Sequence, residues 1–330
     1  MKNKKKMTGK QILWVILVIL GILVVIVIVI ITPWNYSNLA SHPNPVQSYD
    51  EAVQRINALR AQETAGMNPV CTPQFMTHEK KVERAIVIVH GYGNCPQQFH
   101  ELGQRFYDLG YNVLIAPLPH HGLADRMTED HAKLTAEELA TYSDQTADIL
   151  QGLGDHRTML GISMGGIVTA WTAQNRADLD QALILSPMFG FHQIPTAFTA
   201  AAMNVYLTLP DAFVWWDPGK LVDTPPSYGY PRYSKHALVQ ALRLGFATQA
   251  SLKSMPSAAK KLVVVLNAND TAVNNELTME MVKIWQAHNA NISTYVFDAK
   301  LKLGHDMIDP SQSDQKIDIV YPKLIELASQ

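Results

Sequence analysis

Apolar residues along the chain form one long run and then short runs that alternate with helical patterns. Residues 12–31 are a run of 20 in which Gly21 is the one residue that is not strongly apolar. From about residue 82, short apolar runs bounded by turn residues predict strands at 85–89, 112–116, 158–162, 182–185, 262–266 and 293–297. Apolar spacing predicts helices near 97–109, 135–153, 165–176, 274–289 and 315–328. Such alternation is typical of an α/β fold whose parallel sheet is covered on both faces.

Two segments interrupt this alternation. Residues 33–80 hold five prolines and a short helical stretch near 48–62, which we interpret as a linker with one docking helix. Residues 187–260 are rich in aromatic residues and contain no clear strand. A segment this long is too long for a plain loop in a compact domain, so we predict a helical insertion there. The main domain is then expected to cover residues 81–330.

The long apolar run predicts a transmembrane helix at residues 12–32. Twenty helical residues span roughly 30 Å, which is the thickness of the hydrocarbon core of a bilayer. Five lysines lie within residues 1–11, and no Lys or Arg follows the run until Arg55. This bias places the basic tail in the cytoplasm and the main domain outside it, in a periplasmic or extracellular space. The alternative is a cleaved signal peptide, although its apolar region is usually 7–15 residues and residues 38–40 form a poor cleavage site.

Charge and cysteine content narrow the class further. The 319 residues after position 11 carry 22 basic and 29 acidic side chains, which argues against a nucleic-acid partner. No second apolar run approaches 18 residues, which argues against a multi-span transporter. Cys71 and Cys95 are the only cysteines. In an oxidising compartment they can form a disulfide, but two unpaired thiols remain the alternative because the sequence does not fix their separation.

The segment Gly161-Ile162-Ser163-Met164-Gly165-Gly166 carries the strongest chemical signal. It directly follows the predicted strand 158–162 and opens a predicted helix. Glycines two positions before and after the serine suit a strand-to-helix turn that is too tight for larger side chains. The turn raises the hydroxyl above the carboxyl edge of the sheet, where ligands bind in open α/β folds. We therefore predict that Ser163 is a nucleophile and not a plain turn serine.

A serine nucleophile needs a base, and the base needs an acid that orients it. Asp270 follows the predicted strand 262–266, and His305 follows the strand 293–297 after a turn at Gly304. The chain order Ser163, Asp270, His305 is that of the α/β-hydrolases. Asp298 is the second choice for the acid, and Asp306 is expected to cap or pair locally beside the histidine.

An oxyanion needs backbone N–H donors in fixed positions. One is expected from Met164, the residue after the nucleophile. The other is expected from Tyr92, because Gly91 and Gly93 let the loop after strand 85–89 turn an amide toward the substrate. His90 in the same loop is expected to be a structural histidine that bonds to nearby backbone.

Residues 86–122 read IVIVHGYGNCPQQFHELGQRFYDLGYNVLIAPLPHHG. With Gly161–Gly166, the Asp270 loop and Gly304-His305-Asp306, this segment resembles α/β-hydrolases of the carboxylesterase and monoacylglycerol lipase type, including the serine aminopeptidase S33 (hydrolase-4) group. The resemblance covers about residues 82–328. It implies an eight-stranded, mostly parallel sheet with a lid after the sixth strand, and no cofactor. Pro119-His120-His121-Gly122 departs from the Pro-Gly-His-Gly of many relatives, which bears on the conformation of that loop but not on the triad.

Two weaker patterns have ordinary explanations beside the functional ones. His120, His121 and His131 lack a matching Cys or Asp partner pattern, so no metal is expected. Trp215-Trp216 in the insertion suits an acyl chain or a membrane surface, and equally ordinary packing of helices on the core.

These observations predict a membrane-anchored serine hydrolase that cleaves carboxylic esters of lipid-like, monoacyl type without a cofactor. A peptidase, thioesterase, lactonase or acyltransferase uses the same triad, because fold does not imply substrate. A dehalogenase is less favoured, since it needs an aspartate where Ser163 stands. A non-catalytic binding protein on a hydrolase scaffold is the alternative from a different class.

Overall fold

A seven-stranded sheet forms the centre of the protein in the computed structural model, which describes residues 7–34, 36, 38–61 and 66–330. Strand β1 at one edge runs antiparallel to its neighbour, and the other strands are parallel. In spatial order the strands are β1 (Gln74–Met76), β3 (Asn112–Ile115), β2 (Val82–Val89), β4 (Gly154–Ile162), β5 (Gln181–Leu185), β8 (Lys261–Asn267) and β9 (Ile292–Phe297).

All six strands predicted from the apolar runs are confirmed, each within a few residues. Strand β1 was not predicted, because three residues at a sheet edge leave no readable alternation. The eight strands implied by the resemblance are not confirmed, since the described residues place seven in this sheet. The chain just before β1 carries Pro69 and Pro73 and forms the 3₁₀ turn η1 (Pro69–Cys71). Proline has no N–H to donate to a strand ladder, so this segment adds no strand.

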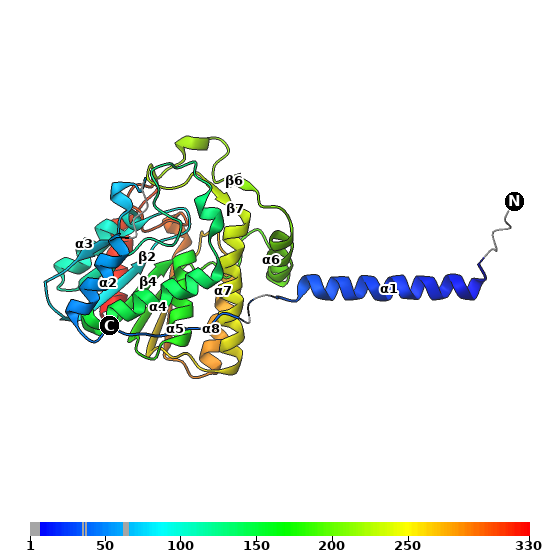
Figure 1. The fold of residues 1–330 in the computed structure, drawn as a ribbon, viewed down its shortest axis with the longest axis horizontal. Coiled ribbons are helices and arrows are strands. Elements are labelled where there is room, and N and C mark those ends of the chain that lie inside the picture. Colours follow the sequence, from blue (N-terminus) through cyan, green and yellow to red (C-terminus); the bar gives the residue numbers. More distant parts are fainter. Residues whose placement is uncertain (1–6, 35, 37, 62–65) are drawn as a thin grey trace.

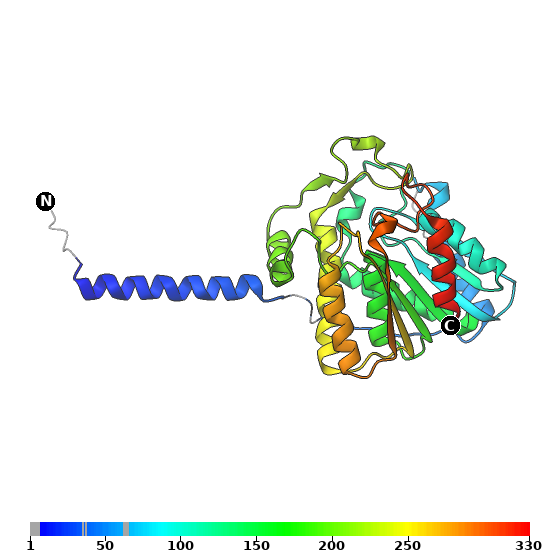
Figure 2. The ribbon, with the colours of Figure 1, turned by 180° about the vertical axis from the view of Figure 1, so that it is seen from behind.

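Successive side chains of each strand point to opposite faces of the sheet, and helices cover both faces. Ile86 and Ile88 of β2 pack with Phe106 and Leu324 on one face, while Val87 joins the other core. Helices α3 (His100–Asp108) and α9 (Ile317–Ser329) cover the first face, where Figure 2 shows the red C-terminal helix. The second face is covered by α4 (Ala136–Leu153), α5 (Met164–Asn175), α7 (Lys235–Ser254) and α8 (Asn275–Ala287) (Figure 1).

The segment before the sheet is attached to the domain at several points. Helix α2 (Tyr49–Ala61) packs against α4 and buries Ile56. Asp144 of α4 accepts hydrogen bonds from the Ser41 hydroxyl and the His42 N–H, both at 2.5 Å. A disulfide joins Cys71 to Cys95 with a Cα–Cα distance of 5.2 Å, which decides between the two alternatives left by the sequence.

The insertion between β5 and β8 is not wholly helical. It contains η4 (Thr196–Phe198), α6 (Thr199–Thr208) and η5 (Leu221–Asp223), followed by α7, but also a two-stranded antiparallel sheet of β6 (Phe213–Trp215) and β7 (Arg232–Ser234). These strands have three residues each and pair only with each other. Strands this short show no alternation that would predict them from the sequence. Helix α7 packs against α5 as part of the layer on the sheet. The part that stands above the sheet edge therefore ends near Ser234.

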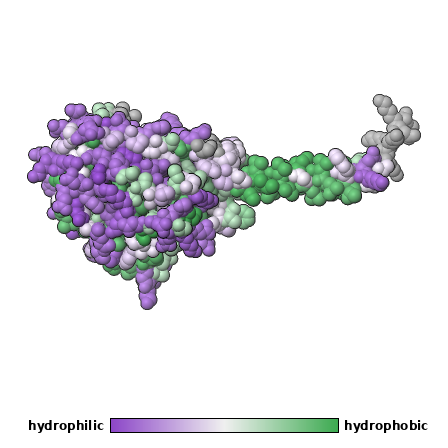
Figure 3. All heavy atoms as spheres, turned by 90° about the horizontal axis from the view of Figure 1, so that it is seen from below, coloured by the Kyte–Doolittle hydropathy of each residue, from purple (hydrophilic) through white to green (hydrophobic). Residues whose placement is uncertain are grey.

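Helix α1 (Gly9–Ile31) projects from the domain, and none of its residues is buried (Figure 1). Figure 3 shows it as a green apolar rod joined to a domain whose visible face is largely purple. Among the described residues it is the one helix long and apolar enough to cross a membrane, a test that a signal sequence also passes.

Candidate active site

Ser163 lies in the turn between β4 and α5, at the carboxyl edge of the sheet. Its backbone has φ 58° and ψ −114°, a conformation that L-residues rarely adopt. Three backbone hydrogen bonds hold it there: its N–H donates to Leu185 O, and its carbonyl accepts from Ile167 N and Met188 N, all at 3.1 Å. Such strain persists only where the surroundings fix it, and it is frequent at active sites.

The glycines around Ser163 are needed because other backbone approaches them closely. A Cβ at Gly161 would collide with the carbonyl of Gly165, and one at Gly165 would collide with the carbonyl of Val89. The structure thus gives the physical reason for glycines on both sides of the serine, as the sequence predicted.

His305 and Asp270 form a hydrogen-bonded pair, with 2.8 Å between Nδ1 and Oδ2. Asp270 is 4% exposed, and its other oxygen accepts from Ala272 N at 2.9 Å and Val273 N at 3.1 Å. Because a carboxylate only accepts hydrogen bonds, Nδ1 carries a proton and Nε2 of the neutral ring is the acceptor. The imidazole is therefore held in the tautomer of a general base.

The environment separates the pKa values of this pair. Burial by itself raises the pKa of Asp270, but the His305 imidazole and the two backbone donors outweigh it and leave the pKa below its ordinary value. Burial by itself lowers the pKa of His305, but the carboxylates of Asp270 and Asp306 outweigh it and raise the pKa. The carboxylate thus stays ionised and the imidazole is a stronger base than usual.

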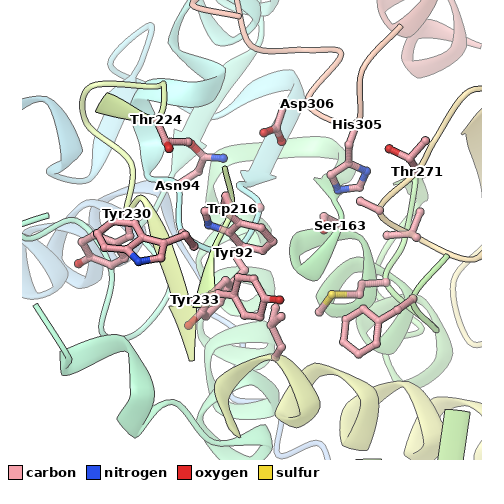
Figure 4. Close-up of a pocket in the computed structure, with 18 of the residues that line it drawn as sticks. Tyr92, Asn94, Ser163, Trp216, Thr224, Tyr230, Tyr233, Thr271, His305 and Asp306 are labelled. Atoms are coloured by element: carbon pink, nitrogen blue, oxygen red, sulfur yellow. The ribbon is translucent and has the colours of Figure 1, made fainter. Parts of the chain in front are cut away.

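Ser163 and His305 line the same cavity of about 600 Å³ (Figure 4). Figure 4 shows the His305 ring next to Ser163, with Asp306 above and to the left of the ring. More than half of the lining residues come from the insertion. Its apolar and aromatic contributions to the wall are Met188, Phe191, Ile194, Tyr206, Trp215, Trp216, Tyr230, Tyr233, Leu238 and Val239. The sequence left Trp215-Trp216 open between contact with an acyl chain or membrane and ordinary packing, and the structure places both residues in the cavity wall.

The two candidate oxyanion donors lie at neighbouring strand ends. Strand β2 pairs directly with β4, so the loop carrying Tyr92 is next to the Ser163 turn. A Cβ built on Gly91 would be 3.7 Å from that of Ser163. Met164 is the first residue of α5, where backbone N–H groups have no partner within the helix. The Tyr92 ring is buried, and its hydroxyl hydrogen-bonds to His131 Nδ1 at 2.6 Å, so the ring itself is engaged in structure.

Gln98 connects the loop that carries Tyr92 to the loop that carries His305. No sequence pattern singled it out. Its side chain is fully buried. Its Oε1 accepts from Gly91 N at 2.9 Å, and its Nε2 donates to Asp306 Oδ1 at 3.0 Å. The loop after β2 is thereby tied to the loop that presents His305. A glutamine carries no motif, so the sequence offered no signal for this role.

The two other acids near the histidine have partners of their own. Asp298 accepts from Lys300 N at 2.8 Å and caps η6 (Ala299–Leu301). Asp306 accepts from Gln98, 208 positions away in the chain, and not from a group beside the histidine as the sequence predicted. Neither takes the place of Asp270 beside His305.

His90 is a structural histidine, as expected. Its Nε2 accepts from Leu118 N at 2.9 Å, so its Nδ1 donates to Gly91 O at 2.8 Å. Burial lowers its pKa to about 4, which keeps the ring neutral. This ring connects the loop after β2 to the loop after β3.

His120, where the family resemblance implies glycine, has a left-handed backbone, with φ 63°. Its ring nitrogens lie 3.0 Å from the carboxylates of Asp130 and Glu138, which stabilise this conformation in place of a glycine. No cluster of His, Cys, Asp or Glu with the arrangement of a metal site occurs in the part of the chain that the structure describes.

Comparison with known proteins identifies the family. The sequence model of the serine aminopeptidase S33 (hydrolase-4) family matches residues 80–296, about two thirds of the chain. The chain belongs to this family. The resemblance to α/β-hydrolases of the carboxylesterase and monoacylglycerol lipase type is thereby confirmed.

A curated relative of this S33 member is the probable lysophospholipase L2 of Haemophilus influenzae (strain ATCC 51907 / DSM 11121 / KW20 / Rd), 26% identical over 136 residues. The match covers 38% of this chain and 43% of the relative, so it spans less than half of the relative's length.

Solved structures of lipolytic enzymes share the fold of this S33 member. A structure from work on the metagenome-derived lipolytic enzymes LipS and LipT has a TM-score of 0.59 and 18% identity, over 80% of this chain and 99% of the other. The monoacylglycerol lipase of Paleococcus ferrophilus has a TM-score of 0.55 and 16% identity, over 78% and 97%. A soluble variant of the monoglyceride lipase of Saccharomyces cerevisiae has a TM-score of 0.57 and 12% identity, over 78% and 90%. The family model shows a hydrolase of the S33 group, and these likenesses show the shared fold.

Proposed function

We propose that the protein is a membrane-anchored serine hydrolase that cleaves carboxylic esters of monoacyl, lipid-like substrates. The observation that carries the proposal is the shared cavity of Ser163 and His305, with Asp270 bonded to the far side of the imidazole. A strained serine, an oriented neutral base and a buried carboxylate are the three parts that nucleophilic hydrolysis requires.

In this mechanism Ser163 Oγ attacks the ester carbonyl while His305 Nε2 takes its proton. Asp270 keeps Nδ1 protonated and stabilises the imidazolium that forms. The imidazolium then protonates the leaving alcohol, and the serine retains the acyl group. Water, deprotonated by His305, releases the acid and restores the serine. No cofactor takes part.

The developing oxyanion is stabilised by backbone N–H groups of Met164 and Tyr92. Both belong to segments next to Ser163, one at the start of α5 and the other in the loop after β2. Donors already fixed in position cost no reorganisation during the reaction, which is why such groups contribute strongly to rate.

The cavity wall supports an acyl chain as the substrate group. Its volume falls within the range of small-molecule sites, and its insertion-derived wall is largely apolar and aromatic. The lipolytic activities named for the relatives agree with such a substrate. We further propose that α1 is retained as the anchor, with the hydrolase domain outside the cytoplasm, as the lysines before the helix suggest.

A fluorophosphonate probe tests the chemistry, because it labels an activated serine. Wild-type protein should be labelled, and Ser163→Ala and His305→Ala should not. Ser163→Ala should reduce turnover by roughly 10⁶-fold. Ser186→Ala, at a buried serine outside the cavity lining, is the matched control and should retain labelling. Absence of labelling in folded wild-type protein would contradict the proposal.

A panel of esters from acetyl to palmitoyl, with monoacylglycerols, thioesters and peptide amides, tests the substrate class. We expect the highest kcat/KM among medium- and long-chain monoacyl esters. Faster turnover of amides or thioesters would assign the same triad to a peptidase or thioesterase.

Mass spectrometry of the membrane-extracted protein tests the anchor, since a mature form starting near Ser41 would show that the helix is cleaved off.

A further inference from the structure

The insertion exposes apolar side chains on its outer surface. On α6 and at its two ends the exposed large apolar residues are Phe198, Val205 and Leu209, which are seven and four positions apart and so share one face of the helix. We call these three residues the outer apolar surface. Apart from Leu221 and Val222 of η5, exposed large apolar side chains in the rest of the described hydrolase domain are scattered singly, as is normal for a protein in water. A concentration of this kind marks a contact surface.

Helix α6, which carries part of this surface, is attached to the end of α1. The Asn204 side chain is 4% exposed, and its Nδ2 donates to the carbonyls of Ile30 and Thr32, both at 2.8 Å. The last carbonyls of a helix have no partner within it, so Asn204 satisfies groups that would otherwise be open. Figures 1 and 2 both show α6 beside the domain-proximal end of α1.

This attachment determines where α6 lies relative to a membrane. Helix α1 has 23 residues and so measures about 35 Å, slightly more than the hydrocarbon core of a bilayer. If α1 spans the bilayer, its Thr32 end lies at the outer interface. Helix α6 and the outer apolar surface then lie at the level of the headgroups and the upper acyl chains.

The charge of the same segment favours apolar insertion over attraction to anionic lipid. Residues 196–222 carry Asp211, Asp217 and Lys220, a net charge of −1. Binding through a basic patch needs several Lys or Arg near the surface, which this segment does not have. The interaction expected here is burial of apolar side chains in the interface, which neutral lipids support equally well.

We propose that the outer apolar surface docks on the bilayer leaflet from which α1 emerges, and that the Asn204 contact fixes the insertion to the anchor in that position. The inner side of the insertion lines the cavity through Tyr206 and Trp216. The docked insertion therefore presents the cavity to lipid-borne substrate. This inference rests on the proposed anchoring by α1.

Depth-dependent quenching in vesicles tests docking on the full-length protein. Leu209→Cys, labelled with the fluorophore NBD and reconstituted in phosphatidylcholine vesicles, should be quenched by lipids with a doxyl group near the top of the acyl chain. Leu109→Cys is the matched control, because the two leucines have similar exposed fractions, 58% for Leu109 and 52% for Leu209. Leu109 follows α3, which lies on the far side of the domain from α1 (Figure 1). Equal absence of quenching at both positions would overturn the proposal. Quenching only with anionic lipid would also overturn it.

Asn204→Leu tests the contact between α6 and α1. We expect quenching at position 209 to fall, and kcat/KM for a long-chain monoacyl ester in vesicles to fall roughly tenfold, because two short hydrogen bonds are lost. Hydrolysis of a short soluble ester should stay within about twofold, since the catalytic residues are untouched. Thr208→Val, on the same helix but bonded to its own helix carbonyls, should change neither value. Unchanged vesicle activity in Asn204→Leu would refute the role of the contact.

These readouts separate the two proposals. Fluorophosphonate labelling of Ser163 reports on the chemistry whether or not the surface docks. NBD quenching reports on docking whether or not an ester is cleaved. Labelling without quenching would support the proposed hydrolase and refute the proposed docking surface. Quenching without labelling would support the docking surface and refute the hydrolase.

Discussion

Replacing Gln98 with leucine tests whether the link between the two catalytic loops matters for chemistry. The substitution keeps a side chain of similar volume but removes both hydrogen bonds, to Gly91 N and to Asp306 Oδ1. A buried donor left without a partner costs about 1–3 kcal/mol, and the lost bond to a carboxylate costs a similar amount. We therefore expect Gln98→Leu to lower the free energy of unfolding by about 3 kcal/mol, or Tm by roughly 10 °C for a domain of this size.

The effect on catalysis should exceed the effect of stability alone. Loss of one oxyanion donor typically costs about 10²–10³ in kcat. Gln98→Leu would displace the loop carrying Tyr92 without removing its N–H, so we expect kcat for a soluble ester to fall by at least about tenfold. The matched control is Gln104→Leu, since Gln104 is an exposed glutamine of α3 bonded to Asp108, and it should behave as wild type.

The pH profile distinguishes positioning from a purely structural role. Burial raises the pKa of Asp306 above its ordinary value and the bond from Gln98 opposes this rise, so loss of the bond should raise that pKa further and make the carboxyl more often neutral. A neutral Asp306 no longer raises the pKa of His305. The acid limb of kcat/KM should then move to lower pH. A variant with reduced Tm but wild-type kcat and an unmoved acid limb would refute the reasoning.

Three further predictions concern the triad, the disulfide and the cavity. Because the pKa of His305 is raised, kcat/KM of the wild type should fall with decreasing pH around a midpoint above 6.5. Asp270→Asn should move that midpoint to lower pH and reduce kcat by about 10⁴-fold in a steady-state assay. Replacing Cys71 and Cys95 with alanine should lower the free energy of unfolding in urea by about 3.5 kcal/mol, from the sequence separation of 24, and an unchanged midpoint would contradict this. Lys235 lines the cavity and is without a carboxylate partner among the described residues, so Lys235→Met should reduce kcat/KM roughly tenfold for lysophospholipid but not for monoacylglycerol.

The sequence predicted the parts of the fold and site that local patterns encode. Strand β4 and the turn at Ser163 are readable because an apolar run, a serine and its flanking glycines are consecutive. Asp270 and His305 are readable because each follows an apolar strand. In a parallel sheet such strands end at one edge, so residues far apart in the chain meet without any further signal.

The parts that the sequence did not reveal depend on contacts between distant segments. Gln98 and Asn204 are amides without a motif, and Asn204 bonds to a carbonyl 172 positions away. Strands β6 and β7 have three residues each and stabilise each other across the insertion. The conformation of His120 depends on Asp130 and Glu138, which no spacing rule connects to it.

The two ends of the insertion are attached to different parts of the molecule. The Arg126 guanidinium donates to the carbonyls of Val222, Thr224, Pro226 and Gly229, which fixes the second half of the insertion to the loop after β3. Helix α6 in the first half is bonded instead to the end of α1 through Asn204. Tyr206 on α6 and Tyr230 beside the fixed loop both line the cavity. If α1 spans the bilayer as proposed, a change in the angle between anchor and domain would act on the cavity wall at Tyr206 while the wall at Tyr230 stayed in place.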